Sequence, residues 1–418
     1  MLVFKFGGAS VKDANGLVNL ANIVKKYSGS QLLIVVSAMG KTTNALEKLT
    51  KAYTDRSNEV YSLFEEIKLY HYDILNTLFE PTDPVFNDVA NTFVEIDWII
   101  EDEPQDAYDF IYDQLVSVGE LVSTRIVNAY LNNCNLKSRW LDVRGYIHTD
   151  NTYREGVVQM DKTCLSIDND IPRLLQTGLV VTQGFLGGTS ENFTTTLGRE
   201  GSDYTASIFA ACLGAESVTT WKDVPGILNA DPKFFADTIK FDELSYTEAI
   251  EMTYYGASVI HPKTIKPLQN VGIPLLVKSF NEPDSPGTVI KEGGINHFIK
   301  PVIILKQNQV LLSVSAKNYS FISENQLSDI FGVLAQNRVK VNLMQTSALS
   351  FTICFDLYEE RFVKLFEELS RDFNIKYNTG LTLITVRHYS ADSLKELTAG
   401  KTILLEQVSR NTLQMIVR

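Results

Sequence analysis

The apolar and polar positions of the first 290 residues follow one repeating pattern. Short contiguous apolar runs, such as 32–36 and 179–182, alternate with longer stretches of helical spacing, such as 11–27. Contiguous apolar runs are typical of strands buried on both faces, and the helices between them are typical of right-handed crossovers. The pattern therefore predicts an α/β domain over residues 1–290, with a mostly parallel open sheet between helical layers.

One stretch departs from this repeat. Residues 51–112 have helical spacing, are rich in acidic and aromatic side chains, contain no glycine and carry proline only at positions 81, 84 and 104. We expect a helical insertion on the sheet domain here, rather than a separate catalytic unit.

The pattern changes again after residues 291–294, which we interpret as a linker. Beyond it the spacing predicts short strands and two helices: strands 302–305, 310–314, 339–344, 350–355, 381–386, 402–407 and 412–417, and helices 324–338 and 361–373. Repeated strand–helix–strand–strand–helix units are typical of ferredoxin-like α+β modules. We therefore expect two such modules in residues 291–418, the second of them abbreviated.

Composition narrows the class of protein. The hydrophobic fraction is 44%, and no apolar run approaches the ~20 residues of a membrane-spanning helix. The net charge of −12 argues against a nucleic-acid surface, which relies on clustered lysine and arginine. The four cysteines (Cys134, Cys164, Cys212 and Cys354) have no metal-type spacing, and we expect reduced thiols in a cytoplasmic protein.

The first strand carries the strongest chemical signal. Lys5 interrupts an apolar run, and Gly7 and Gly8 follow directly. A lysine inside a buried strand needs an anion, and glycines let the backbone approach one closely. A phosphate over this turn satisfies both conditions. The alternative is a lysine that extends from an edge strand into solvent, followed by an ordinary turn.

Polar residues also follow three other predicted strands. Residues 37–44 carry hydroxyls where open α/β sheets bind ligands, although Thr43 or Asn44 would equally suit a helix cap. Residues 198–205 bring glycines, a hydroxyl and Asp203 to the start of a helix expected at 206–213, which suits an anion. Asp223 and Asp231 suit a nucleotide's ribose and base, or an unliganded surface turn.

These elements together predict a phosphate site assembled from several strand ends. The chain lacks the spacing of a Walker loop and of a dinucleotide fingerprint. Phosphoryl transfer mainly needs positioning and charge neutralisation, which Lys5, glycine N–H groups and a bound Mg²⁺ would supply. Glu120, which lies among apolar neighbours, and Arg199, whose fork suits a carboxylate, would hold the acceptor.

The motifs resemble those of the aspartate kinases. Residues 5–11, Lys-Phe-Gly-Gly-Ala-Ser-Val, are similar to that family's N-terminal signature, and further matches follow in the family's order over essentially the whole chain: residues 36–38, 43–44, 119–120, 184–185, 198–204, 223–227, 231–232, 256–257, 261–262 and 286–288. The resemblance implies the amino-acid-kinase fold. It also implies transfer of the γ-phosphoryl group of ATP, with Mg²⁺, to the side chain of L-aspartate.

The resemblance also implies roles for single residues. The catalytic residues would be Lys5, which stabilises the transferring phosphoryl, and Asp203, which organises that lysine. Aspartate would be bound by Ser37, Thr43, Glu120 (α-ammonium), Arg199 (α-carboxylate) and Ser202. The nucleotide would be bound by Lys5, Gly7, Gly8, Ser10, Lys222, Asp223, Asp231, Lys233 and Lys263. No residue is expected to bind a metal directly.

Four positions depart from the family's usual residues: Ala9 and Lys222 replace threonine, Lys233 replaces arginine and Ser258 replaces lysine. The last change removes a positive charge near ATP. We hypothesise that Lys222 or Lys263 compensates for it.

The C-terminal part resembles the family's paired ACT modules, which bind an end-product amino acid. Effector-binding residues would be Asn342, Leu343, Thr346 and Ser347, with Asn342 where the family usually has an acid. The resemblance implies feedback by lysine or threonine and a homodimer formed through these modules. Two alternatives stay open: another small-molecule carboxylate kinase of the same family, and a non-catalytic amino-acid sensor.

Overall fold

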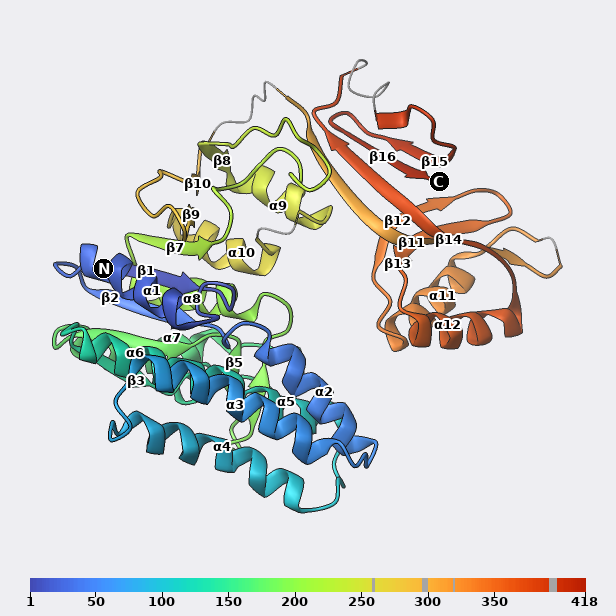
Figure 1. Cartoon of the computed structure of the whole chain (residues 1–418). Coiled ribbons are helices and arrows are strands. Elements are labelled where there is room, and N and C mark those ends of the chain that lie inside the picture. Colours follow the sequence, from blue (N-terminus) through green and yellow to red (C-terminus); the bar gives the residue numbers. More distant parts are fainter. Residues whose placement is uncertain (258–259, 295–299, 319, 391–396) are drawn as a thin grey trace. The chain divides into compact units, whose positions relative to one another are not determined.

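The computed structural model covers residues 1–418 and describes residues 1–257, 260–294, 300–318, 320–390 and 397–418. These residues form two compact units (Figure 1). The described parts of the first unit are residues 1–227, 240–253 and 260–294, and those of the second are 228–239, 254–257, 300–318, 320–390 and 397–418. The second unit therefore includes two short segments that precede residue 290.

A largely parallel sheet organises the first unit. Within the described residues it has eight strands in the order β3-β4-β2-β1-β7-β9-β10-β8. The strands are β1 (Leu2–Phe6), β2 (Leu32–Val36), β3 (Ser138–Leu141), β4 (Leu179–Gln183), β7 (Ser217–Lys222), β8 (Glu243–Ser245), β9 (Leu275–Ser279) and β10 (Thr288–Lys291). Every pair is parallel except β9 and β10. This confirms the predicted sheet and places β1 at its centre.

Helices cover both faces of this sheet, which explains the contiguous apolar runs. They are α1 (Ala14–Lys26), α2 (Thr42–Thr54), α3 (Val60–Leu78), α4 (Val85–Glu101), α5 (Tyr108–Val116), α6 (Val118–Asn133), α7 (Met160–Leu175), α8 (Gly201–Leu213), α9 (Tyr246–Tyr254) and α10 (Pro262–Val271), with a 3-10 turn, η1 (Val143–Gly145). Phe4 and Phe6 join one core with α1 to α6. Because side chains alternate along a strand, Lys5 points to the opposite face, where α8 contacts β1.

Residues 51–112, read as a helical insertion, contain the end of α2, all of α3 and α4 and part of α5. Aromatic side chains tie these helices to one another. Phe64 of α3 and Phe93 of α4 have ring centroids 5.8 Å apart, and Phe93 is 5.6 Å from the ring of His71. The insertion is therefore packed on the same core as α1 and α6.

Several short elements differ from the pattern's prediction. The hairpin β5 (Leu186–Gly188) and β6 (Thr194–Thr196), and the short strands β8 and β10, have no long apolar run to mark them. Helix α8 begins at Gly201, five residues before the predicted start, so Asp203 lies within its first turn.

An antiparallel sheet forms the centre of the second unit. Its strands, in the order β12-β13-β11-β14-β16-β15, are β11 (Val302–Ala316), β12 (Val341–Thr346), β13 (Phe351–Asp356), β14 (Phe373–Arg387), β15 (Ile403–Val408) and β16 (Thr412–Val417). Helices α11 (Glu324–Gln336) and α12 (Glu359–Asp372) pack on it through Ile330 and Leu365. The predicted strands 302–305 and 310–314 are one strand, because β11 continues through a register shift between Lys306 and Gln309.

The cysteine prediction is wrong for two of the four residues. Cys164 of α7 and Cys212 of α8 form a disulfide, with their Cα atoms 5.0 Å apart. Cys134 and Cys354 are free, as expected. Among the described residues no helix combines the length and the apolar character needed to cross a membrane.

Candidate active site

A buried carboxylate between two ammonium groups lies at the centre of the candidate site. Asp203 Oδ1 is 2.7 Å from Lys5 Nζ, and Oδ2 is 2.9 Å from Lys222 Nζ. Strands β1 and β7 are neighbours, so both lysines reach the first turn of α8 from adjacent strands. Burial alone would raise the pKa of Asp203, but the charges of Lys222 and Lys5 lower it far below its ordinary value. The acid is therefore ionised and bridges the two lysines.

The pKa of Lys222 also depends on its acidic neighbours. Burial opposes its charge, but the carboxylates of Asp203 and Glu200, and then that of Asp223, raise its pKa above the ordinary value. Its Nζ lies 3.7 Å from Glu200. The site thus brings two ammonium groups together at the ends of β1 and β7.

The glycine turn after β1 leaves open space beside Lys5. A Cβ on Gly7 would have Lys5 Nζ as its only described neighbour within 4 Å, at 3.6 Å. At Gly8 a Cβ would lie 2.6 Å from the carbonyl oxygen of Ala38, so only glycine fits there. Ser10 is different, because its hydroxyl donates to the carbonyl of Trp221 at 3.4 Å and is buried. Ser10 therefore joins the turn to β7.

The predicted aspartate-binding residues occupy three neighbouring segments. Glu120, in the first turn of α6, is 2% exposed, and its Oε1 accepts a hydrogen bond from the backbone of Ala38 at 3.3 Å. Burial raises the pKa of Glu120 to about 8, although the Ala38 N–H and the charge of Lys5 act in the opposite direction. Among the described atoms, Oε2 has no hydrogen-bond partner. Its free oxygen is thus available to a cationic ligand.

The backbone around Ser37 is fixed from two sides. Its N–H donates to the carbonyl of Phe6 at 3.1 Å, and its carbonyl accepts from the hydroxyl of Ser123 at 2.7 Å. Thr43 lies in the first turn of α2 and is partly buried. Ser202 packs against Gly184, where a Cβ would lie 2.4 Å from the Cβ of Ser202. These contacts hold the ends of β2, β4 and α8 close together.

Arg199 is placed less firmly than the other predicted ligands. It lies in the turn before α8, between Gly198 (φ +76°) and Glu200 (φ +55°), and its side chain is exposed. Within the described part of the chain, nothing pairs with its guanidinium. The structure therefore leaves this cation to solvent in the absence of ligand.

The predicted nucleotide residues divide between the two units. Asp223, directly after β7, and Lys263, in the first turn of α10, are exposed residues of the first unit. Asp231 and Lys233 belong to the second unit, where Asp231 Oδ1 accepts from the backbone of Lys233 at 2.9 Å. Ser258 lies outside the described residues.

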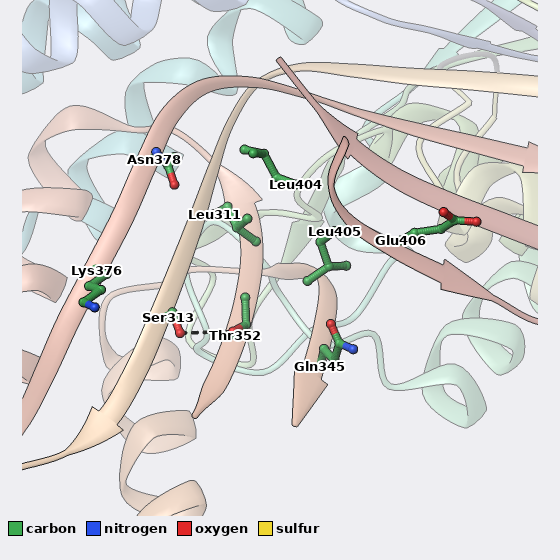
Figure 2. Close-up of a pocket in the computed structure, with 9 residues that line it drawn as sticks. All are labelled: Leu311, Ser313, Gln345, Thr352, Lys376, Asn378, Leu404, Leu405 and Glu406. Carbon is green, nitrogen blue, oxygen red and sulfur yellow. Dashed lines mark hydrogen bonds between the residues drawn. The ribbon is translucent and has the colours of Figure 1, made fainter. Parts of the chain in front are cut away.

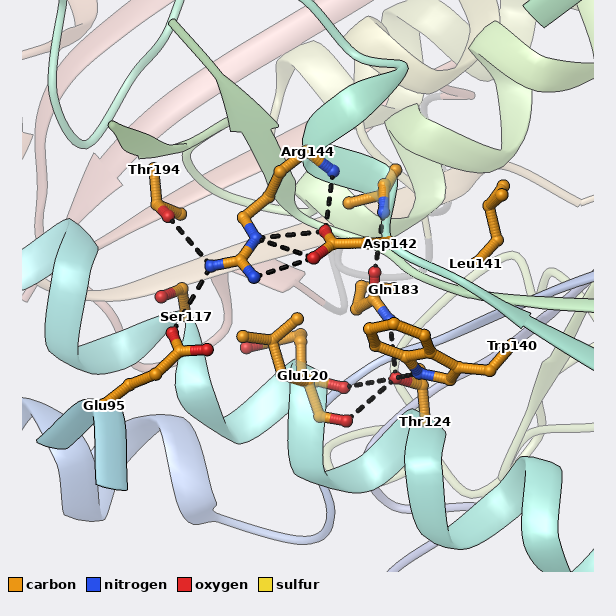
Figure 3. A network of polar contacts seen from close by, with 12 residues as sticks. Glu95, Ser117, Glu120, Thr124, Trp140, Leu141, Asp142, Arg144, Gln183 and Thr194 are labelled. Carbon is orange, nitrogen blue, oxygen red and sulfur yellow. Dashed lines mark hydrogen bonds and ion pairs between the residues drawn. The ribbon is translucent and has the colours of Figure 1, made fainter. Parts of the chain in front are cut away.

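A buried polar network beside Glu120 was missed by the sequence interpretation (Figure 3). Thr124 Oγ1 accepts from Gln183 Nε2 at 2.7 Å and from Trp140 Nε1 at 2.9 Å, and it donates to the carbonyl of Glu120 at 2.9 Å. Gln183 Oε1 in turn accepts from the backbone of Val143 at 2.8 Å. The network fixes α6, and with it Glu120, against the ends of β3 and β4. The signal for it was Gln183 at the end of an apolar strand.

Figure 3 also shows Arg144, which stabilises the neighbouring turn. Its guanidinium binds Asp142 (2.7 Å from Nη2 to Oδ2) and reaches Glu95 of α4 at 3.4 Å. Burial opposes the charge of Arg144, but Asp142 and Glu95 raise its pKa. The helical insertion is therefore linked by charge to the segment after β3.

The predicted effector residues differ in their burial and in their contacts. Asn342 Oδ1 accepts from Lys306 Nζ at 2.7 Å, and Asn342 Nδ2 donates to Gln309 at 2.8 Å. Leu343 is buried in an apolar cluster. Thr346 is exposed, and the hydroxyl of Ser347 bonds within its own hairpin turn. The four predicted residues are thus a hydrogen-bonded amide, a buried leucine, an exposed strand residue and a turn residue.

The second unit has an open cavity of about 470 Å³ on its sheet (Figure 2). The lining includes Gln345 of β12 and Leu405 of β15, two strands at opposite ends of the sheet order. Thr352 donates to Ser313 at 3.1 Å on its floor. The cavity borders β12, next to the predicted effector strand residues.

The comparisons with known proteins agree with this arrangement. The profile of the amino acid kinase family matches residues 1–279. The chain belongs to the amino acid kinase family.

Within that family it groups with the aspartokinases. Over 359 residues it is 33% identical to the lysine-sensitive aspartokinase 3 of Escherichia coli (strain K12). The aligned region covers 85% of this chain and 78% of that protein. The crystal structure of E. coli aspartokinase III with aspartate and ADP matches with a TM-score of 0.86 at 28% identity, covering 100% of this chain and 96% of that chain. The structure of the same protein with lysine and aspartate has a TM-score of 0.81 at 29% identity, with the same coverage.

Proposed function

We propose that this chain is an aspartate kinase, which transfers the γ-phosphoryl group of ATP to the side-chain carboxylate of L-aspartate and forms 4-phospho-L-aspartate. The observation that carries the proposal is the pair of ammonium groups, Lys5 and Lys222, on the buried carboxylate of Asp203 beside the open glycine turn. The related E. coli enzyme, crystallised with aspartate and ADP, supports the same substrates. This reaction is the first step of the biosynthesis of lysine, threonine and methionine.

Lys5 would stabilise the charge that develops on the transferring phosphoryl. Its ammonium is already desolvated and oriented by Asp203, so it needs no reorganisation when the phosphate arrives. Gly7 leaves the space above that ammonium in which the phosphate would lie, and Gly8 keeps the turn close to the end of β2.

Magnesium would enter with the nucleotide as MgATP. The described residues contain no group of three His, Cys, Asp or Glu side chains that would hold a metal ion, and Asp203 is neutralised by two lysines. The residues present therefore suit a metal carried on the phosphates. Asp223 and Lys263 are proposed nucleotide contacts, while Asp231 and Lys233 stay predictions from the sequence.

Aspartate would bind by its two charged α-groups. Glu120 has one free carboxylate oxygen for the α-ammonium, and Arg199 has a free guanidinium for the α-carboxylate. Ser37, Thr43 and Ser202 lie on the segments that border Glu120 and α8. In this assignment the side-chain carboxylate is the group that stays free to accept the phosphoryl.

The second unit is proposed to be regulatory, with residues 1–290 catalytic and 291–418 forming two ACT modules, the second abbreviated. An amino-acid effector, lysine or threonine, would bind near β12, and Thr346 and Ser347 are the exposed candidates. Asn342 and Leu343 would act by supporting that strand. The lysine sensitivity of the E. coli relative favours lysine. Inhibition assays with each amino acid separate the two.

Two further parts of the proposal concern assembly and location. We expect a homodimer formed through the ACT modules, and light scattering at micromolar concentration that shows only monomer contradicts it. The cytoplasmic location stays a prediction from the sequence.

A hydroxamate assay with ATP, Mg²⁺ and hydroxylamine tests the activity. Aspartate-dependent hydroxamate supports the proposal. Glutamate-dependent hydroxamate indicates another carboxylate kinase of the family, and no signal with any amino acid indicates a non-catalytic sensor.

A further inference from the structure

Two loops meet at the proposed site, and a residue of the helical insertion touches both. We call residues 7–13, between β1 and α1, the phosphate loop, and residues 37–41, between β2 and α2, the substrate loop. The N–H of Gly40 donates to the carbonyl of Gly8 at 3.0 Å. This backbone bond and the close packing of Gly8 on the carbonyl of Ala38 join the loops directly.

Tyr70 of α3 supplies such a contact. Its hydroxyl donates to the carbonyl of Lys12, in the phosphate loop, at 2.5 Å. The same oxygen would lie 2.5 Å from a Cβ on Gly40, in the substrate loop. Gly40 has φ +57°, a conformation that favours glycine, and the absence of a side chain lets the hydroxyl approach the backbone. One phenol thus bonds one loop and packs against the other.

The next residue of α3 fixes the far end of the substrate loop. His71 is fully buried, with Nδ1 2.7 Å from the carbonyl of Ile67 and Nε2 3.4 Å from Thr42 Oγ1. Thr42 in turn donates to the carbonyl of Met39 at 2.6 Å. The Tyr70 and His71 rings are 5.0 Å apart, and His71 packs on Phe93 of α4. The phenol is therefore held by a packed helix pair.

We propose that Tyr70 is a positioning residue, which sets the distance between the phosphate loop and the substrate loop so that the phosphoryl donor and its acceptor meet in register. The effect of Tyr70 on the reaction rests on the proposed function, whereas its contact with the two loops does not. Phosphoryl transfer depends mainly on positioning, and small displacements of the reacting groups lower the rate strongly. The helical insertion then contributes to the reaction without touching either substrate.

The variant Tyr70→Phe tests this, because it removes the hydroxyl and keeps the ring that packs on His71. Tyr53→Phe is the matched control. Tyr53, on α2, also donates its hydroxyl to a backbone carbonyl, that of Asp102 at 3.0 Å, but this bond lies within the insertion and touches neither loop.

For Tyr70→Phe we expect kcat to fall about tenfold, while the dissociation constants for MgATP alone and for aspartate alone change less than about twofold. Tyr53→Phe should keep the wild-type kcat. A merely structural role predicts no such separation of turnover from binding. A kcat of Tyr70→Phe within twofold of wild type overturns the proposal.

Hydrogen exchange provides a readout that does not depend on activity. Tyr70→Phe should speed exchange of amides in residues 7–13 and 37–42, the Gly40 N–H above all, whereas Tyr53→Phe should not. Unchanged exchange in both loops overturns the positioning role of Tyr70, even if the wild type is an active aspartate kinase. If Tyr70→Phe exchanges faster but the wild type has no aspartate kinase activity, the contact of Tyr70 with the two loops is supported and the proposed function is rejected instead.

Discussion

Lys5 Nζ lies 2.7 Å from Asp203 Oδ1, although the lysine comes from the first strand of the chain and the acid from α8. The other oxygen of Asp203 is 2.9 Å from Lys222. Without ligand, each buried ammonium thus has a counter-charge. This avoids the free-energy cost of leaving a charge unpaired in the interior. In the proposed mechanism, an incoming phosphate would meet two cations that are already in place.

Lys5→Ala should lower kcat by at least about two orders of magnitude, because the transferring phosphoryl loses its nearest cation. Aspartate binding should survive, since Glu120 and Arg199 are untouched. Steady-state kinetics with ATP and a calorimetric aspartate titration measure the two effects. Lys48→Ala, at an exposed position of α2, serves as the control. Near-normal turnover would remove Lys5 from the mechanism.

Lys222→Ala should weaken ATP binding about tenfold, whereas Lys263→Ala should change it less than about threefold. The reason is burial: Lys222 is held against Asp203, while Lys263 is exposed and its charge is screened by solvent. Fluorescence titrations with a nucleotide analogue compare the two. If both variants bind like wild type, neither lysine compensates for the serine at position 258.

Aspartate binding should strengthen as the pH rises from 6 to 8. The buried carboxyl of Glu120 has a pKa of about 8, so it is mostly protonated at pH 6 and must ionise to pair with an α-ammonium. Binding therefore releases a proton, and affinity should rise up to about tenfold per pH unit below 8, then level off.

Calorimetry in buffers of different ionisation enthalpy counts the released proton. Glu120→Gln should bind aspartate weakly and without this pH dependence. An affinity of wild type that is flat between pH 6 and 8 contradicts the assignment of Glu120.

Reduction of the Cys164–Cys212 disulfide should destabilise the first unit. The bond joins α7 to α8 across 48 positions of sequence, and cross-links of this span restrict the unfolded chain by about 2–4 kcal/mol. Thermal unfolding with and without dithiothreitol measures the loss.

Cys164→Ser should unfold at the lower temperature under both conditions, while Cys134→Ser should behave like wild type. An unfolding temperature that does not respond to reductant means that the two thiols are not joined in solution.

Much of the sheet domain was predictable because its strands are buried on both faces. The run 32–36 identified β2, and Lys5 within such a run indicated an anion. The short strands β8 and β10 were missed, since three- and four-residue strands carry too few side chains for a pattern. Strand β11 was split because its polar residues Lys306–Gln309 coincide with a register shift rather than a turn.

The sequence indicated the residue types of the candidate site, but not the contacts between them. The pattern placed Asp203 at a helix start. The contact of Lys222 with Asp203, however, depends on the pairing of β1 with β7, which the pattern does not give. Tyr70 and Thr124 gave no signal, because a tyrosine or threonine on an amphipathic helix is ordinary. Their roles come from carbonyls and side chains distant in sequence, which spacing does not encode.

The two fifteen-residue strands β11 and β14 pair with each other along nearly their full length. At about 3.3 Å per residue, each extends some 50 Å if straight. This pair spans the sheet, because β13 pairs with residues 309–314 of β11 and β16 with residues 382–387 of β14, at opposite ends of the pair. We therefore expect a ligand that displaces β12 to shift β16 as well, through the backbone hydrogen bonds of the β11–β14 pair.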